Sequence, residues 1–127
     1  MRLSDAEWEV MDVVWREGSA TARIAHDALR PATGWAYTTV KTMLARLAEK
    51  GALDVLRDGR SSVYRPCVSR EEARRSAVRS LVDRAFDGAA APMLRFLVKD
   101  RGLTSGERRE LRRILRGEKR GGKVGKR

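Results

Sequence analysis

Residues 36–47, with the sequence AYTTVKTMLARL, decide the fold because they form a helical pattern with two different faces. Apolar side chains recur at the three- and four-residue spacing of a buried stripe; they are Val40, Met43, Leu44 and Leu47. The other face carries hydroxyl groups, two cations and the small residue Ala45, with no carboxylate before Glu49. Because hydroxyls and cations bond both phosphates and base edges, this face is predicted to contact DNA.

Two shorter helices are predicted before this stretch. Ser4 and Glu7 form the pattern of a capping box that opens the first helix, and Gly18 ends it. Thr21 is a suitable N-cap for the second helix, and Pro31 and Gly34 are expected to bracket the break before the main helix. The apolar positions of the second helix that we expect to face inward are Ile24, Ala25, Ala28 and Leu29.

A β-hairpin is predicted after the main helix, which ends at Gly51. Residues 53–57 and 60–66 have strand patterns, and Asp58-Gly59 between them is a strong turn signal. The hairpin carries Arg60 near its tip, where it could follow a phosphate backbone as the wing of a winged helix-turn-helix. An ordinary exposed hairpin with solvated arginines is the alternative.

The positive charge of the chain is unevenly distributed. The formal net charge is +11 over 127 residues. Residues 1–66 carry ten Lys or Arg and nine Asp or Glu, a net charge of +1, whereas residues 67–127 carry eighteen and eight, a net charge of +10. The DNA-binding module must therefore gather its cations on one surface. Lys41, Arg46 and Lys50 are expected to do so on the main helix, where Glu49 is the opposing negative charge.

The pattern after Pro66 becomes purely helical. Three short helices are indicated, the first opened by Ser69 with Glu72 and the last by Thr104 with Glu107. Their apolar stripes are wide, and about 50 residues rarely make a stable core alone. A second copy of the chain would cover the stripes, so a homodimer is predicted. The expected dimerisation residues are Val78, Leu81, Val82, Phe86, Leu94, Leu97, Leu111 and Ile114.

The expected fold is mainly α with a small β-hairpin wing. It comprises a winged helix-turn-helix DNA-binding domain over residues 1–67 and a helical dimerisation domain over residues 68–116. Residues 117–127 are rich in Gly, Lys and Arg without periodicity, which indicates a disordered basic tail. This tail could make a non-specific DNA contact or could simply increase solubility.

Enzymatic chemistry has little support in the sequence. The only histidine is His26 and the only cysteine is Cys67, so neither a nucleophilic triad nor a metal cluster can be assembled, and no cofactor is expected. Cys67 is expected to act as a small apolar residue. No signal peptide or membrane-spanning run is visible, and a cytoplasmic protein without membrane insertion is expected.

Three stretches together resemble the penicillinase-repressor family, the BlaI, MecI and CopY type of bacterial transcriptional regulators. They are the opening helix LSDAEWEVMDVVW (residues 3–15), the main helix AYTTVKTMLARL with Lys50-Gly51 behind it, and the return strand RSSVYRP (residues 60–66). The resemblance extends over residues 3–116 in order and spacing.

This resemblance implies a homodimeric repressor that binds palindromic, inverted-repeat operators in double-stranded DNA, with the main helix in the major groove. It favours control of a beta-lactam-resistance or related stress operon. Our assignment gives Arg46 and Thr42 to base edges or flanking phosphates, and Lys41 and Thr39 chiefly to phosphates. The full set of expected DNA-binding residues is Thr38, Thr39, Lys41, Thr42, Arg46 and Arg60.

Two departures from the family pattern concern induction. In the beta-lactam-responsive members, a membrane sensor-protease triggers cleavage at an Asn-Phe bond in the helical tail, either directly or through a downstream protease. The corresponding pair here is Arg95-Phe96, so this region is the candidate cleavage site and the route of induction stays open. Copper-responsive members have cysteine-rich motifs near the C-terminus, which this chain lacks.

Two alternative functions remain at the level of the sequence. The basic second half would suit a non-specific DNA-binding protein with strong salt dependence. Some winged-helix domains are protein-interaction modules, but those commonly have an acidic or apolar outer face on the third helix. The Thr, Lys and Arg face of residues 36–47 favours DNA over a protein partner.

Overall fold

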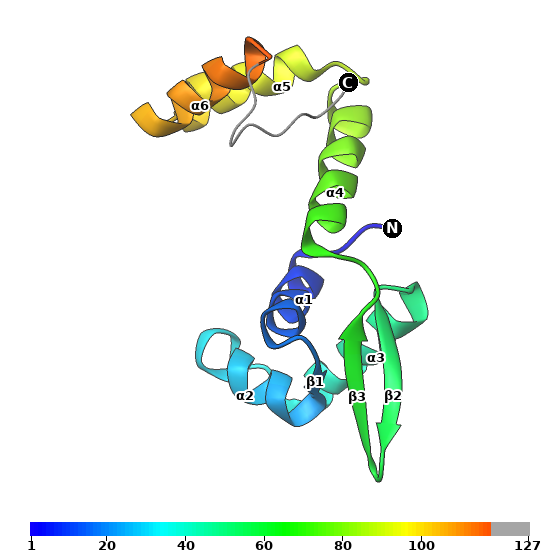
Figure 1. The fold of residues 1–127 in the computed structure, drawn as a ribbon. Helices are drawn as coiled ribbons and strands as arrows, with labels where there is room; N and C mark the ends of the chain where they lie inside the picture. The colour runs from blue at the N-terminus through cyan, green and yellow to red at the C-terminus, as the bar shows by residue number, and fades with distance from the viewer. Residues whose placement is uncertain (118–127) are drawn as a thin grey trace. The chain divides into compact units, whose positions relative to one another are not determined.

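The computed structural model describes residues 1–117, without the side chain of Asp58. The predicted basic tail, apart from Gly117, therefore lies outside the described residues. The chain divides into two compact units, Met1–Leu81 and the residues from Val82 onward. The architecture is mainly helical with a small antiparallel sheet, as the sequence predicted (Figure 1).

The first unit is a winged helix-turn-helix. Its sheet has the strand order β1-β3-β2, and its three complete helices precede the β2–β3 hairpin (Figure 1). The elements are α1 (Asp5–Glu17), β1 (Ala20–Thr21), α2 (Ala22–Thr33), α3 (Tyr37–Lys50), β2 (Leu53–Asp58), β3 (Ser61–Pro66) and α4 (Arg70–Ala85), which continues past the boundary of the unit.

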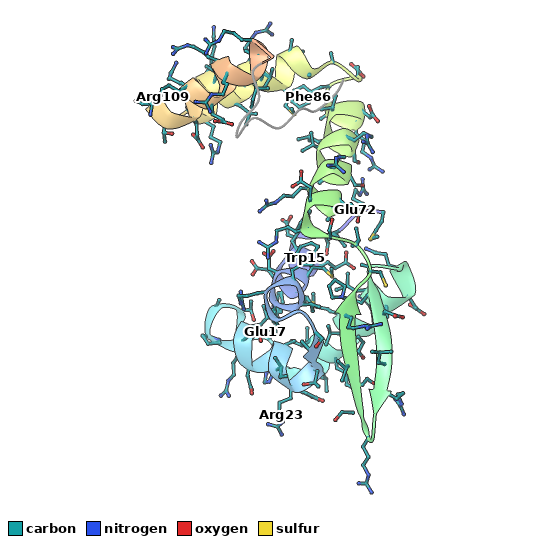
Figure 2. The ribbon with its side chains drawn as sticks, viewed as in Figure 1. Trp15, Glu17, Arg23, Glu72, Phe86 and Arg109 are labelled. Atoms are coloured by element: carbon teal, nitrogen blue, oxygen red, sulfur yellow. The ribbon has the colours of Figure 1, made fainter. Side chains whose placement is uncertain are left out.

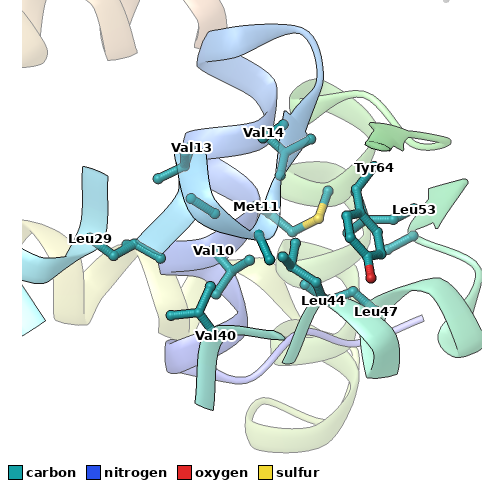
Figure 3. Packing of buried hydrophobic residues seen from close by; sticks show 14 residues of the cluster. Val10, Met11, Val13, Val14, Leu29, Val40, Leu44, Leu47, Leu53 and Tyr64 are labelled. Carbon is teal, nitrogen blue, oxygen red and sulfur yellow. The ribbon is translucent and has the colours of Figure 1, made fainter. Parts of the chain in front are cut away.

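The core of the first unit is formed where α1, α2 and α3 meet the hairpin (Figure 3). Met11 of α1 and Leu44 of α3 have no exposed surface, and Tyr64 of β3 is only 7% exposed. The predicted stripe of α3 is buried at Val40, Leu44 and Leu47, with Met43 half-buried. The inward face of α3 was therefore predicted correctly from its periodicity.

The sheet differs from the prediction in two respects. Ala20 and Thr21 form a short strand that pairs with Tyr64 and Val63, so the sheet has three strands and not two. Asp58 pairs with Ser61, which makes Gly59 and Arg60 the turn residues, one position later than predicted. Gly59 has a φ of +65°, a left-handed conformation that suits glycine at the first central position of a tight hairpin.

The predictions for α2 were only partly right, because Ala25 and Leu29 face inward as expected but Ile24 and Ala28 do not. The buried residues are Ala22, Ala25 and Leu29, spaced by three and four, which leaves Ile24 44% exposed and Ala28 exposed. The helix also continues through Pro31 to Thr33, so the break does not begin at the proline but at the C-cap Gly34, whose φ is +68°. A proline in the last turn removes a single backbone donor, and the helix tolerates this loss near its end.

The beginning of α4 is attached to α1. The Trp15 indole nitrogen donates a hydrogen bond of 2.8 Å to the carbonyl oxygen of Val68, and the Arg70 guanidinium lies 5.3 Å from the Trp15 ring centroid. Ala73 is also buried. These contacts explain why the compact unit extends to Leu81, beyond the boundary at residue 67 expected from the sequence.

The second unit consists of short helices without a buried residue among those described. Helix α5 (Ala90–Phe96) continues as a π-helical segment (Leu97–Arg101), and α6 (Ser105–Leu115) follows (Figure 1). The predicted capping box of Thr104 and Glu107 is present. Phe86 and Phe96 are in contact, with ring centroids 5.9 Å apart. Within residues 1–117, no helix combines the length and apolar composition that a membrane span requires.

Candidate nucleic-acid interface

The face of α3 opposite the core is fully open to solvent. Thr38, Thr39, Lys41, Thr42 and Arg46 are all exposed, whereas Val40, Leu44 and Leu47 on the other side have no exposed surface. The structure therefore places every α3 residue of the predicted interface on one accessible surface. This arrangement is what a helix entering a groove of DNA needs.

The N-terminus of α3 differs from those of its neighbours. Ser4, Thr21 and Ser69 each accept a hydrogen bond from a backbone N–H in the first turn of α1, α2 and α4, respectively. Ala36, the N-cap of α3, offers no side-chain acceptor. Unsatisfied N–H groups at a helix N-terminus favour an anion such as phosphate.

A polar hollow of about 320 Å³ lies beside this end of α3. It joins α2, α3 and the wing, and among the lining side chains that the structure describes, four are cations and none is a carboxylate. Figure 2 shows one of them, Arg23, extending from α2 away from the core. The lining residues are Thr21, Ala22, Arg23, Tyr37, Lys41, Arg57, Arg60, Ser61, Ser62 and Tyr64.

The hollow brings together only part of the predicted interface. Lys41 and Arg60 both line it, although they come from α3 and the hairpin turn. Thr38, Thr39, Thr42 and Arg46 do not line it. The interface therefore combines two surfaces, the outer face of α3 and a cationic hollow at its side.

Two cations in the hollow were not in the predicted contact set. Arg57 lies on β2 near the end of the hairpin, and its Nη1 donates a hydrogen bond of 3.1 Å to Ser62 Oγ. Arg23 follows closely after the Thr21 cap of α2, and no periodic signal identified it. Among the side chains that the structure describes, Arg23, Lys41 and Arg60 have no ion-pair partner. Their charges are therefore available to an anion.

His26 supports the start of α3. Its Nε2 atom lies 3.0 Å from the carbonyl oxygen of Trp35, and its ring meets that of Tyr37 edge-on at 5.8 Å. Tyr37 is the first residue of α3 and lines the hollow. The histidine thus fixes the loop between α2 and α3, which indicates a structural role.

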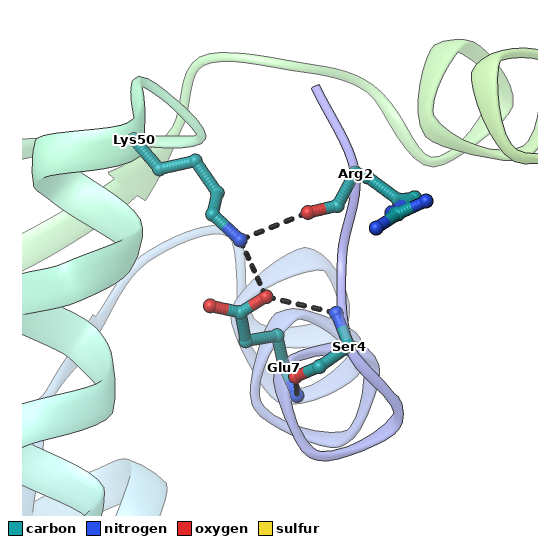
Figure 4. A network of polar contacts seen from close by, with 4 residues as sticks. All are labelled: Arg2, Ser4, Glu7 and Lys50. Atoms are coloured by element: carbon teal, nitrogen blue, oxygen red, sulfur yellow. Dashed lines mark hydrogen bonds and ion pairs between the residues drawn. The ribbon is translucent and has the colours of Figure 1, made fainter. Parts of the chain in front are cut away.

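Lys50 does not contribute to the outer face as the sequence suggested. Its ammonium donates to Glu7 Oε1 at 2.6 Å and to the carbonyl oxygen of Arg2 at 2.8 Å (Figure 4). Glu7 is largely buried, with 13% of its side chain exposed. Burial by itself would raise the pKa of Glu7, but hydrogen bonds from Lys50 and Ser4 and the Lys50 charge lower the pKa overall. The sequence did not predict this because the acceptor of the Lys50 ammonium, the Glu7 carboxylate, lies on α1, far away in the sequence.

The predicted dimerisation residues lie at or near the surface of their own units. In the first unit, Val78 and Leu81 are 51% and 49% exposed. In the second unit, Ile114 is 58% exposed and lines an apolar groove of about 250 Å³. The other predicted residues, Val82, Phe86, Leu94, Leu97 and Leu111, are half-buried or exposed.

The remaining candidate residues concern Cys67, metal binding and proteolytic cleavage. Cys67 is exposed, so its expected role as a small apolar filler was wrong; the Val68 side chain next to it packs on the core instead. Within residues 1–117, no group of three or more His, Cys, Asp or Glu side chains could hold a metal ion. Arg95 and Phe96, the candidate cleavage region, are exposed at the end of α5.

Comparison with known proteins identifies the family. The profile of the family described as Penicillinase repressor matches residues 3–117. This chain belongs to the penicillinase repressor family. The Penicillinase repressor of Bacillus licheniformis is 36% identical over 115 residues, which cover 90% of this chain and 89% of that protein. The methicillin resistance regulatory protein MecI of Staphylococcus aureus is 26% identical, over 89% of this chain and 92% of that protein.

Solved structures agree with this membership. The DNA-binding domain of the repressor BlaI is 37% identical, with a TM-score of 0.51, and the match covers 57% of this chain and 93% of that domain. Monomeric Bacillus licheniformis BlaI in complex with the blaP half-operator is 38% identical, with a TM-score of 0.50, over 57% of this chain and 88% of that chain. The family and the fold are those of DNA-binding transcriptional repressors and not of enzymes.

Proposed function

We propose that this member of the penicillinase repressor family is a homodimeric repressor that binds an inverted-repeat operator in double-stranded DNA. The carrying observation is the exposed hydroxyl and cation face of α3 beside the cationic hollow. The relative solved with a half-operator supports the same partner for this chain. Because the target would be the bacterial chromosome, the proposed place of action is the cytoplasm.

The two surfaces of the interface have different roles in this proposal. Arg46 and Thr42 on the outer face of α3 contact base edges or flanking phosphates, where hydrogen bonds carry sequence information. Lys41, Thr39 and Thr38, near the N-terminus of α3, contact phosphates. Arg60 holds the phosphate backbone on the wing side, and the hollow adds Arg23 and Arg57 to that contact.

Dimerisation is supported by the uncovered apolar surface. Leu97 is 38% exposed and Ile114 is 58% exposed, in a unit that buries no described residue. Two linked half-site modules multiply the affinity of each one, so a dimer on a palindrome would exclude polymerase far better than a monomer. The proposed repression is therefore steric.

We infer the regulated pathway from the relatives of this chain. Penicillinase and methicillin-resistance repressors among the relatives support a beta-lactam-resistance or related stress operon. Proteolytic induction through a membrane sensor-protease or a downstream protease would act at Arg95-Phe96, which is exposed where α5 passes into the π-helical segment. Mass spectrometry of the protein from beta-lactam-treated cells tests this, since cleavage there gives a fragment that begins at Phe96.

Fluorescence anisotropy tests the main proposal. The intact protein is titrated onto a duplex from upstream of its own gene and onto a scrambled duplex of equal length and composition, at about 150 mM salt. A preference of about a thousandfold or more supports the specific repressor, and footprinting then locates the inverted repeat. Equal, strongly salt-dependent binding to both duplexes favours a general DNA-binding protein, and absence of binding favours a protein-interaction module.

A further inference from the structure

The last residue of α3 is tied to the beginning of the chain. Lys50 is the C-terminal residue of α3, and its ammonium donates hydrogen bonds to the Glu7 carboxylate and to the carbonyl oxygen of Arg2 (Figure 4). Glu7 is itself fixed, because its carboxylate accepts a hydrogen bond of 2.8 Å from the backbone N–H of Ser4. One lysine therefore joins the end of the DNA-facing helix to residues 2–7.

Residues 1–4, which we name the N-terminal strap, are also held from α4. The Ser76 hydroxyl donates a hydrogen bond of 3.1 Å to the carbonyl oxygen of Met1. Two consecutive carbonyl groups of the strap thus accept bonds from two different helices, α4 and α3. The strap is an anchored segment, so a bond to it restrains α3.

Side-chain packing holds only part of the strap. Leu3 packs against the core, but a hollow of about 390 Å³ lies beside Met1, Arg2 and Leu3. Other residues that line it are Trp8, Val68 and Ala73. Because packing is incomplete here, the hydrogen bonds of Lys50, Glu7 and Ser76 carry much of the restraint.

We propose that Lys50 is a positioning residue: it fixes the C-terminal end of α3 to the N-terminal strap and to Glu7, and it does not contact DNA. This inference rests on the proposed function, because it concerns how α3 is presented to the operator. A lysine next to an exposed cationic helix face would ordinarily be taken for a phosphate contact. The internal acceptors at 2.6 and 2.8 Å argue otherwise.

The two roles predict different salt dependence. A lysine that contacts a phosphate releases counterions, so its loss lowers the slope of log K against log salt by about 0.9. A positioning lysine leaves this slope unchanged, but its loss weakens binding at every salt concentration, because α3 must then be ordered on binding. Glu7 gives an even sharper contrast. Removing a carboxylate strengthens binding if only net charge matters, but weakens binding if Glu7 positions Lys50.

The experiment compares Lys50→Met and Glu7→Gln with the wild type. Affinity for the duplex from upstream of the gene is measured by anisotropy at about 50–300 mM salt. Methionine keeps the apolar stem of Lys50, and glutamine can still accept the bond from Ser4. Lys41→Met is the phosphate-contact control, and Glu9→Gln, at an exposed position of α1, is the matched charge control.

The expected result is a loss of about two- to fivefold in affinity for both test variants, with an unchanged salt slope. Lys41→Met should lower the slope by about 0.9, and Glu9→Gln should not weaken binding. A lower slope for Lys50→Met, or tighter binding by Glu7→Gln, overturns the proposal.

Hydrogen exchange on the DNA-free protein separates this proposal from the proposed function. Backbone amides at the end of α3, from Leu47 to Ala52, should exchange about two- to fivefold faster in both test variants than in the wild type. This measurement tests whether Lys50 restrains the end of α3, and it does so even if the wild type shows no preference for the upstream duplex. Unchanged exchange in Lys50→Met contradicts the proposal.

Discussion

The two units of this chain use similar apolar patterns with opposite results. In the winged-helix unit, α1, α2 and α3 direct their stripes toward one another and the sheet, and residues such as Val10 and Leu44 have no exposed surface. From Val82 to Gly117, no described residue is buried, although Leu94 and Leu97, and likewise Leu111 and Ile114, are spaced by three residues as on one face of a helix. An apolar stripe shows that one face of a helix must be buried. Other elements of the same fold or a second chain must supply the apolar surface that buries it.

The largest effect is expected from a substitution that disrupts the proposed dimer contact of α4 and the second unit. Leu81→Asp places a charge on an apolar position that is 49% exposed and should convert the dimer into monomers. Operator affinity should then fall by about a hundredfold or more, because two linked half-sites become one. Sedimentation at micromolar concentration measures the first effect, with Arg79→Asp, at an exposed polar position of α4, as the control. A variant that still sediments as a dimer would contradict the prediction.

A matched leucine pair tests the difference in burial. Leu44→Ala removes a side chain with no exposed surface and should lower the free energy of unfolding by about 2–5 kcal/mol. Leu115→Ala, at a position 70% exposed, should change it by less than about 0.5 kcal/mol. Urea unfolding followed by circular dichroism gives both values. Equal losses would mean that Leu115 is covered in solution, and the concentration dependence of unfolding would show whether a second copy covers it.

The outer face of α3 should affect binding without affecting folding. Arg46→Ala should weaken specific operator binding by about 1–3 kcal/mol, as expected for the loss of a base contact. Unfolding of this variant should match the wild type, because Arg46 is exposed and lies opposite the core. Anisotropy with the upstream and scrambled duplexes tests the assignment. An unchanged preference for the upstream duplex would remove Arg46 from the set of base-reading residues.

The smallest expected effect concerns acid stability in the winged-helix unit. The pKa of Glu7 is lowered in the folded protein from an ordinary value of 4.5, so its ionised form stabilises the fold. This contribution is present above pH 4.5 and is lost as the pH falls through the lowered folded value. The stability difference between wild type and Glu7→Gln should therefore shrink below about pH 4. Urea midpoints from pH 6 to pH 3 measure this change, and a constant difference would argue against the linkage.

Local patterns determined much of the fold. The capping boxes at Ser4 and Thr104 and the N-cap at Thr21 are present as expected, because each acts within a single turn. The period of α3 predicted its buried side. The strand β1 was missed because two residues have no periodicity, and their pairing with β3 depends on segments more than 40 residues apart.

The candidate interface divides in the same way. The sequence identified the cations and hydroxyls on the outer face of α3 because helix geometry alone separates them from Leu44. It could not place Arg23 beside Arg60, since that proximity requires α2, α3 and the wing to converge. Nor could it separate Lys50 from Lys41, because the two lysines have similar local surroundings.

The sequence alone therefore determined the order of the elements, the two faces of α3 and the resemblance to one repressor family. These properties depend on residues within a few turns of one another, where periodicity and capping chemistry act directly. Only the tertiary structure decided which cations remain available to an anion. That choice depends on acceptors brought in from distant segments, as Glu7 and the Arg2 carbonyl engage Lys50 while Lys41 and Arg60 share an open hollow.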